Sequence, residues 1–340
     1  MDTIAIDLHK RESQLRTITS DGVLIECRIV TSRDQFTRTL GDRPRARILV
    51  EASTESEWVV RHLETLGHEV VVADPGFAPM YASRSKRVKT DKRDARALCE
   101  ALRLGAYREI HRASDARRHL RAQLTVRDAR VRTRTRYIAV IKAFVRREGL
   151  SMASGEAIHT LTKLAALPLP PHVREELAPL VAVWAPLGEQ LAAVDATLTA
   201  IAATDPVVTR LRTMPSIGPI TALAFVAALD DVARISNAHQ VQGYLGLVPS
   251  EHSSGDRRVR GRITKRGDVR LRWLLVETGW RILRAPNADL QGLRAWGLRI
   301  AARRGKRIAA VALARRVAGI LYAMWRDDAP FHAVPLAEAA

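Results

Sequence analysis

Apolar and polar positions alternate with two different periods along the first hundred residues. Short apolar or β-branched runs predict five strands, at Ile4–Leu8, Gln14–Thr19, Val23–Val30, Arg47–Glu51 and Glu69–Ala73. Amphipathic stretches predict three helices, at about 33–40, 55–66 and 91–104. The Ser20-Asp21-Gly22 sequence between the second and third runs is typical of a hairpin turn. The chain is therefore expected to begin with three antiparallel strands.

This order of elements, β-β-β-α-β-α-β-α, is that of a ribonuclease-H-like (RuvC-like) mixed sheet. We expect it to form an α/β domain over residues 1–108. Because one fold serves many functions, the function must be argued from the site that the fold carries.

The pattern becomes helical and basic from Asp115 to Arg147, which predicts one long helix. Apolar residues recur there at every seventh position, at Leu124, Val131, Ile138 and Val145. A second segment alternates three and four residues apart, at Leu177, Leu180, Trp184, Leu187, Leu191, Val194, Leu198 and Ile201. Such spacing is typical of a coiled coil, although Pro179 and Pro186 are expected to kink or restart this helix. A helical hairpin within the chain and a contact between copies explain the two seams equally well.

A third, mostly helical region begins after Asp205-Pro206. It contains a Pro-Ser-Ile-Gly-Pro turn at 215–219, a polar and basic loop at 249–267, and helices to about residue 326. The expected domains are thus the sheet at 1–108, a basic and coiled-coil region at 109–205, a helical domain at 206–328 and a tail at 329–340.

The charge of the chain indicates a polyanionic partner. Lys and Arg number 55 against 36 Asp and Glu, for a net charge of +19, and this favours nucleic acid first and an anionic membrane second. No uninterrupted apolar run approaches the roughly 18 to 20 residues that span a bilayer, and the charged amino terminus does not resemble a signal peptide. The two cysteines, Cys27 and Cys99, lie far apart, which favours a reducing cytosol and argues against structural zinc.

Four carboxylates stand out against this basic background because of where they lie. Asp7 and Glu51 end two strands that would be neighbours in the sheet, and Asp91 and Asp94 share one face at the start of a helix. Converging carboxylates can hold the Mg²⁺ ions that phosphoryl transfer uses. Taken alone, Asp91 and Asp94 are also explained by helix capping and the helix dipole, and the two strand-end acids by strand-edge solubility.

The residues around these acids are more specific than the acids themselves. The segments IAIDLHK, ILVEAS and KTDKRDARAL resemble, in order and register, the amino-terminal motifs of the DEDD-type insertion-sequence transposases. This is the IS-one-ten, or bridge-recombinase, family, to which the pilin-gene invertase is related. Farther on, LRTMPSIGPITALAFVAAL, YLGLVPSEHSSG and GRITKRGDVRLRWLL resemble the transposase domain of the same family. The resemblance covers most of the chain, with the middle helices matching only in character.

The resemblance implies a role for particular residues. Asp7, Glu51, Asp91 and Asp94 would hold Mg²⁺, and Ser254, with Ser253 as the alternative, would attack DNA as a nucleophile. A serine attacking a phosphate needs the developing charge neutralised, and the loop supplies basic residues at Arg257, Arg258, Arg260, Arg262, Lys265 and Arg266. His252 is adjacent but is interpreted as a bystander.

The turn at 215–219 resembles a helix-hairpin-helix element, in which Gly218 would contact a phosphate. Ser216 stands where the family has glycine, so a purely structural turn explains this segment as well.

The expected function is therefore that of a DNA recombinase that excises and inserts, or inverts, a mobile element. The resemblance further implies a structured bridge RNA as partner and a homodimer or homotetramer, in which Ser254 of one subunit completes the acidic site of another. Two other classes remain open. One is a metal-dependent junction resolvase or nuclease with no covalent intermediate, and the other is a non-catalytic nucleic-acid-binding scaffold.

Overall fold

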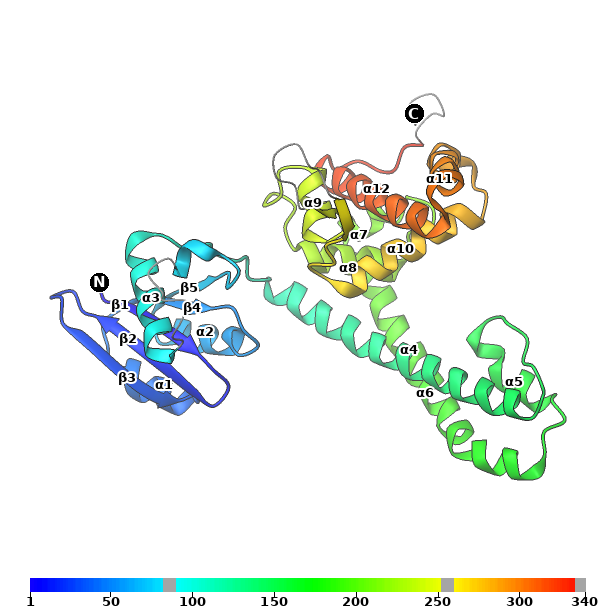
Figure 1. Ribbon diagram of the computed structural model, residues 1–340, viewed down its shortest axis with the longest axis horizontal. Helices are drawn as coiled ribbons and strands as arrows, with labels where there is room; N and C mark the ends of the chain where they lie inside the picture. The colour runs from blue at the N-terminus through cyan, green and yellow to red at the C-terminus, as the bar shows by residue number, and fades with distance from the viewer. Residues whose placement is uncertain (82–89, 252–259, 334–340) are drawn as a thin grey trace. The chain divides into compact units, whose positions relative to one another are not determined.

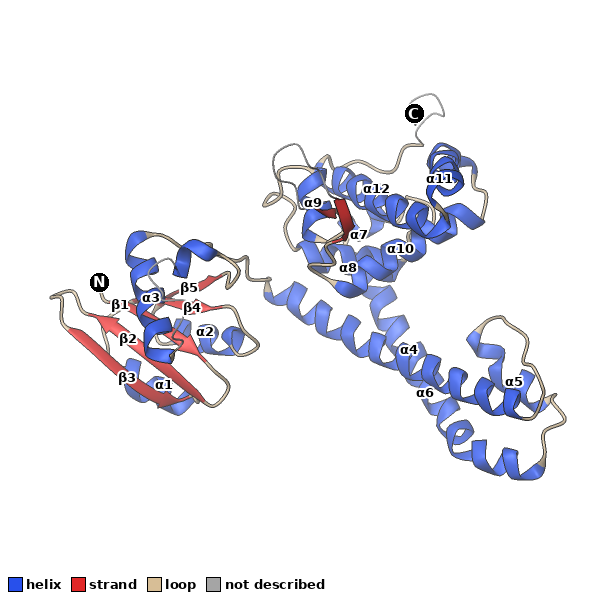
Figure 2. Cartoon of the chain, viewed as in Figure 1, coloured by secondary structure: helices blue, strands red, loops and turns tan. Residues whose placement is uncertain are grey.

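A computed structural model of the chain describes residues 1–81, 90–251 and 260–333. The chain divides into two compact units, Met1–Arg112 and Ala113–Ala340. Figure 2 shows that the strands lie in the first unit, apart from one short pair in the second.

The first unit is built on a mixed five-stranded sheet (Figure 1). Its strands are β1 Thr3–Leu8, β2 Glu12–Ile18, β3 Leu24–Val30, β4 Arg47–Glu51 and β5 Glu69–Ala73. Their order is β3-β2-β1-β4-β5, with β1, β2 and β3 antiparallel and β1, β4 and β5 parallel. The predicted antiparallel start is confirmed, and the mixed sheet is compatible with the predicted RuvC-like fold.

Period-two alternation along the strands divides their side chains between two helical layers. Ile4, Ile6 and Val50 belong to the core under α1 Arg33–Leu40 and α2 Ser56–Thr65. Ala5 and Leu49 face the other way, into the core under α3 Asp91–Leu104. Asp7 and Glu51 lie two residues beyond Ala5 and Leu49 on the same strands, so their side chains also belong to the α3 face.

The second unit begins with two long helices that pack on each other, α4 Asp115–Arg147 and α6 Pro171–Thr204. Between them lie η2 Ala157–His159 and α5 Thr160–Ala165. Every seventh residue of α6 is buried, at Leu177, Trp184, Leu191 and Leu198. These residues of α6 thus pack within the chain, and a contact between copies of the chain stays a prediction.

Helix α6 continues through both prolines and does not restart at either. Pro179 and Pro186 are exposed. The carbonyl groups that each proline leaves without a helical donor are therefore within reach of water, which is why an unbroken helix tolerates them.

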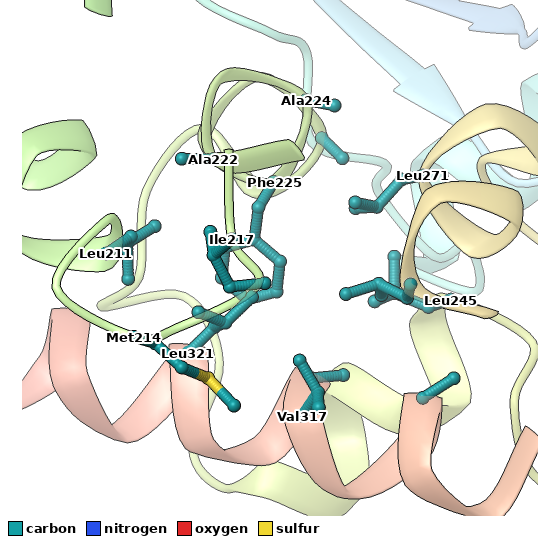
Figure 3. Close-up of a cluster of buried hydrophobic side chains, with 14 of the residues drawn as sticks. Leu211, Met214, Ile217, Ala222, Ala224, Phe225, Leu245, Leu271, Val317 and Leu321 are labelled. Carbon is teal, nitrogen blue, oxygen red and sulfur yellow. The ribbon is translucent and has the colours of Figure 1, made fainter. Parts of the chain in front are cut away.

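The rest of this unit packs helices around one large core. The helices are α7 Pro206–Leu211, α8 Pro219–Leu229, α9 Ala238–Tyr244, α10 Val269–Arg284, η3 Ala288–Leu290, α11 Gln291–Arg304 and α12 Lys306–Arg326. Phe225 of α8, Ile217 of the preceding turn and Leu321 of α12 meet in this core (Figure 3). Helix α8 is buried along almost its whole length, because nearly all its residues are apolar.

Two helices, α6 and α12, are long and apolar enough to cross a membrane by length and composition. Neither helix is an uninterrupted apolar run, because Glu189 lies within α6 and Arg315 and Arg316 lie within α12. The apolar window of α12 is half buried in the core and that of α6 is 17% buried. Core helices of soluble proteins pass the same test, so the feature is weak evidence for a membrane span.

Candidate active site

The two strand-end acids lie side by side on the α3 face of the sheet. The parallel pairing of β1 with β4 sets Ile6 against Val50, so Asp7 and Glu51 are the next residues along adjacent strands. Asp7 is only 5% exposed, whereas Glu51 is half-buried. On the other side of β1, Asp7 is paired with the buried Gln14. The side chains of Gln14, Asp7 and Glu51 thus form a polar row across β2, β1 and β4, at the edge of the apolar core.

The two helix acids are brought to this face by the first turn of α3. Thr90 caps the helix, its hydroxyl accepting from the Arg93 amide, so the cap does not depend on an aspartate. Asp91 is half-exposed at the first helical position. Asp94, one turn later, is only 5% exposed. A carboxylate buried to this degree has a use other than surface solubility.

His9 joins the acids, although sequence reasoning did not include it in the site. Its Nε2 lies 3.3 Å from Oδ2 of Asp7 and 3.5 Å from Oδ1 of Asp91. Ligand atoms of these three residues all lie within 4.8 Å of one another. The signal was available in the sequence, because His9 follows Asp7 by only two positions, just beyond the end of β1 at Leu8.

Asp7 has the strongest electrostatic perturbation of the site. Its pKa is raised from 3.8 to about 6, and the largest cause is burial. The charge of His9 lowers this pKa, and three carboxylates raise it again, in the order Asp94, Asp91 and Glu51. All four predicted acids are therefore close enough to interact.

The buried Oδ2 of Asp7 accepts no hydrogen bond from the described residues. Its contact with His9 is an ion-pair distance without hydrogen-bond geometry. Buried negative charge with unused acceptor capacity is what a cation would relieve.

Two further side chains limit how the acids are arranged. The hydroxyl of Tyr81, at the end of η1 Ala78–Tyr81, donates to Oε2 of Glu51 at 2.5 Å. Arg28 on β3 bonds Glu12 at 2.6 Å and approaches Asp91 at 3.8 Å. Tyr81 thus fixes one oxygen of Glu51, and Arg28 places positive charge at the exposed edge of the site.

The predicted nucleophile lies outside the described residues, as do Ser253, His252, Arg257 and Arg258. The structure does describe the base of this loop in the second unit. There β6 Pro249–Glu251 pairs antiparallel with β7 Arg260–Ile263, and Glu251 lies opposite Arg260. On the β7 side, Arg262, Lys265 and Arg266 are at least partly exposed. The acids and the serine loop therefore belong to different units.

The hairpin base is fixed by a close crossing of two backbone segments. Gly246 and Gly267 both have positive φ, of 65° and 73°. A Cβ atom on Gly246 would lie 2.3 Å from the Arg266 carbonyl oxygen, and one on Gly267 would lie 2.0 Å from that of Tyr244. Only glycine combines this conformation with this approach.

One buried arginine bonds both crossing segments. Nη1 of Arg272, on α10, donates to the carbonyl of Leu245 at 3.0 Å and to that of Arg266 at 2.7 Å. The residue is 8% exposed, so its charge is committed to these carbonyls. It fixes the end of β7 against α9.

The Pro215–Pro219 turn connects α7 to α8. Ser216 adopts a φ of 72°, in the left-handed region. A glycine would take this conformation without steric cost, which explains why serine is the unusual residue here. Gly218 is the N-cap of α8, with a φ of −85°.

Two family models match the chain on either side of α5 and α6. A DEDD transposase model matches residues 4–148. A model described as the transposase IS116/IS110/IS902 family matches residues 208–292. The transposase for insertion sequence element IS1328 of Yersinia enterocolitica is 30% identical over 96% of this chain and 98% of its own length. The chain belongs to the IS110 family of DEDD transposases.

Other members of the family are similar over nearly the whole chain. The transposase for element IS1111A of Coxiella burnetii is 28% identical over 94% of this chain and 88% of its own length. A probable family 20 transposase of Pseudomonas aeruginosa is 28% identical over 95% and 96%. As a transposase of this family, the protein is an enzyme that cuts and rejoins DNA.

Proposed function

We propose that this transposase excises and inserts, or inverts, a mobile DNA element with two sets of chemical groups. The first is a divalent-metal site formed by Asp7, Glu51, Asp91 and Asp94, and the second is the hydroxyl of Ser254. The observation that carries the proposal is the buried Asp7 carboxylate. Three other acids raise its pKa, and its Oδ2 lacks a hydrogen-bond donor among the described residues.

The donor set fits a hard divalent cation, and Mg²⁺ is our proposal. Carboxylate oxygens from two strands and one helix are the ligands that Mg²⁺ prefers, completed by water and phosphate oxygens. Such an ion, when bound, supplies charge neutralisation at the phosphate and a polarised oxygen. The residues themselves hold the geometry: Tyr81 fixes Glu51, and Nε2 of His9 lies within 3.5 Å of carboxylate oxygens of both Asp7 and Asp91.

Ser254 is proposed as the nucleophile on the strength of the family register. Its Oγ forms a bond to phosphorus while one phosphate-ester bond of the DNA breaks. The freed deoxyribose oxygen takes up a proton, and the serine releases its own. Rejoining reverses these steps with a different DNA hydroxyl. The nearby Arg260, Arg262, Lys265 and Arg266 would neutralise the phosphate, with Arg257 and Arg258.

Partners follow from the same resemblance. We propose DNA ends and target DNA as substrates, a bridge RNA as guide, and a homodimer or homotetramer as the active assembly. The net charge of +19 supports polyanionic partners. Sequencing the nucleic acid that co-purifies with the protein tests the guide, since a discrete RNA is expected and its absence would exclude guidance.

The decisive experiment is to trap the covalent link. Purified protein with the nucleic acid that co-purifies with it is mixed with Mg²⁺ and a labelled, nicked element-end duplex and quenched with denaturant, and protein–DNA adducts are resolved by electrophoresis. We expect an adduct with the wild type and with Ser253→Ala, and none with Ser254→Ala. Asp7→Asn should also abolish the adduct while leaving far-ultraviolet circular dichroism unchanged.

The results also separate the other two classes. Cutting by Ser254→Ala would indicate a resolvase-like nuclease that uses the acids alone. No cutting by any form, with DNA binding retained, would indicate a scaffold. The interaction of three acids with the buried Asp7 favours a catalytic site, because a scaffold has no need for like charges gathered around a buried carboxylate.

A further inference from the structure

A deep groove in the second unit is lined by parts of the chain far apart in sequence. One wall is α4 between Leu124 and Ala139, another is the start of α8 from Gly218 to Thr221, and the third is α10 between Val269 and Arg281. The groove encloses about 870 Å³. That is the size of a site for a small organic ligand or a few linked monomers, and far too small for a nucleic-acid duplex.

The groove is strongly basic. Six arginines line it, against the two acids Asp128 and Glu277. Asp128 is already engaged, by Arg132 at 2.8 Å and Arg270 at 3.2 Å. By contrast, Arg134, Arg136 and Arg281 make no ion pair with any acid in the described part of the chain. Free guanidinium groups around a cavity are suited to phosphates.

An exposed tryptophan lies among these arginines. Trp273, on α10, is 56% exposed, whereas Leu271 and Leu275 of the same helix are fully buried. Within the described residues, no aromatic ring or guanidinium group packs on this indole, so its exposed face is open to a ligand. Unpaired bases stack on such faces, and bases inside a duplex do not, because their own faces are already stacked.

Gly218, the N-cap of α8, leaves its part of the wall without a side chain. A Cβ atom there would meet nothing within 4 Å, so this part of the groove is open space.

We propose that this groove binds an unpaired, single-stranded stretch of nucleic acid. One base stacks on Trp273, and flanking phosphates are held by Arg134 and Arg281. Binding here is separate from the chemistry proposed above, because it involves neither the acids nor Ser254. Single-stranded DNA and RNA share the recognised chemistry, and the test distinguishes them.

The test measures binding of labelled oligonucleotides to the full-length protein by fluorescence anisotropy. The probes are oligo-dT and oligo-U of about 12 nucleotides, within the range of known single-strand sites, and a DNA duplex of mixed sequence. Trp273→Ala should weaken single-strand binding about 5- to 150-fold, the range found when one stacking aromatic is removed. Trp273→Phe should retain most of the affinity. Duplex affinity should stay within about twofold of the wild type for both variants, because the proposed stacking requires an unpaired base.

A matched control separates the groove from general surface effects. Leu298, on α11, is also an exposed apolar residue and does not line the groove, so Leu298→Ala should leave single-strand affinity unchanged. Equal losses for Trp273→Ala and Leu298→Ala would overturn the proposal. So would equal losses of single-strand and duplex binding by Trp273→Ala, since these would indicate a nonspecific DNA-binding face.

The contribution of the groove arginines is tested by comparing two double variants. Replacing Arg134 and Arg281 by alanine should lower the slope of log affinity against log salt by about 0.7 for each phosphate that the protein no longer neutralises. Replacing Arg303 and Arg304, two exposed arginines of α11, removes the same charge from outside the groove. Identical slopes for the two double variants would contradict the assignment.

A photocrosslinking experiment identifies where the oligonucleotide binds and whether DNA or RNA is preferred. An oligonucleotide carrying 5-iodouracil, as DNA or as RNA, is irradiated with the protein, and the modified peptide is found by mass spectrometry. We expect the adduct at Trp273, and the polymer that binds more tightly identifies the source. Adducts confined to peptides outside α4, α8 and α10 would refute the site.

Discussion

The acidic site of the first unit and the hairpin base of the second are held in place by opposite means. The acids are positioned by side chains on a sheet face, where buried like charges act against stability. The hairpin base is positioned by backbone crossing at Gly246 and Gly267 and by the buried Arg272, which are stabilising. The repulsion between carboxylates at the acidic site lowers the stability of the fold, whereas the contacts at the hairpin base raise it. Substitutions at the two should therefore change stability in opposite directions.

The largest effect is expected at the backbone crossing. Gly267→Ala should lower the free energy of unfolding of the second unit by about 3 to 5 kcal/mol, because a side chain there meets the Tyr244 carbonyl as well as straining the backbone. Urea unfolding followed by tryptophan fluorescence measures the change.

The control for this substitution is Gly22→Ala. Gly22 has a φ of 83°, but nothing lies within 4 Å of a Cβ atom there. Gly22→Ala should lower the free energy of unfolding by only about 1 kcal/mol, because the backbone conformation alone is unfavourable for alanine there. Equal effects at the two glycines would show that the close approach does not matter.

The next effect is that of Arg272. Arg272→Met keeps most of the side-chain volume but leaves the carbonyls of Leu245 and Arg266 without their donor. We expect a loss of about 2 to 3 kcal/mol. Amide hydrogen exchange should accelerate in residues 244–251 and 260–267 while the sheet of the first unit is unaffected. Unchanged exchange there would mean that the arginine does not fasten the hairpin.

The opposite sign is expected at Asp7. Its folded pKa, about 6, exceeds the ordinary 3.8, so between these values the folded chain keeps a proton that the unfolded chain has lost. Stability due to this group therefore falls as pH rises through that interval and stays lower above it. With EDTA present, Asp7→Asn should raise the free energy of unfolding by about 2 kcal/mol at pH 8 and by little at pH 4. A variant that is less stable than the wild type at pH 8 would contradict this electrostatic account.

The smallest effect is expected at the turn before α8. Ser216→Gly should stabilise the second unit by up to about 1 kcal/mol, because it removes the cost of a left-handed serine. Thermal melting measures the gain. No change, or a loss, would show that the serine side chain makes a compensating contribution.

Much of the fold of the first unit could be predicted from the sequence, because its pattern is local. The apolar runs in IAIDL and ILVE placed two strands, and the bounds of β4, β5, α1 and α3 agree with those expected. In the second unit the bounds of α4 agree as well. Asp7 and Glu51 stood out since acids seldom end buried strands. Asp94 was harder to assign to the site, because an acid at a helix start also interacts favourably with the helix dipole. Only its burial distinguishes these two roles.

The parts that could not be predicted depend on contacts between distant segments. Tyr81 reaches Glu51 from a short helix after β5, and no local pattern connects them. The crossing of Gly246 with Arg266 and the groove around Trp273 arise only when distant helices of the second unit pack together. A restart of the helix at Pro179 or Pro186, one of the two expected outcomes, does not occur, because the cost of proline depends on exposure, and a sequence window does not show this.

The backbone crossing beneath β6 and β7 has a consequence for how this protein can change over time. Any single substitution at Gly246 or Gly267 places a Cβ atom 2.3 Å or less from a carbonyl oxygen of the other segment. These two positions are therefore closed to stepwise change, because a side chain at either one requires the opposite backbone segment to move first.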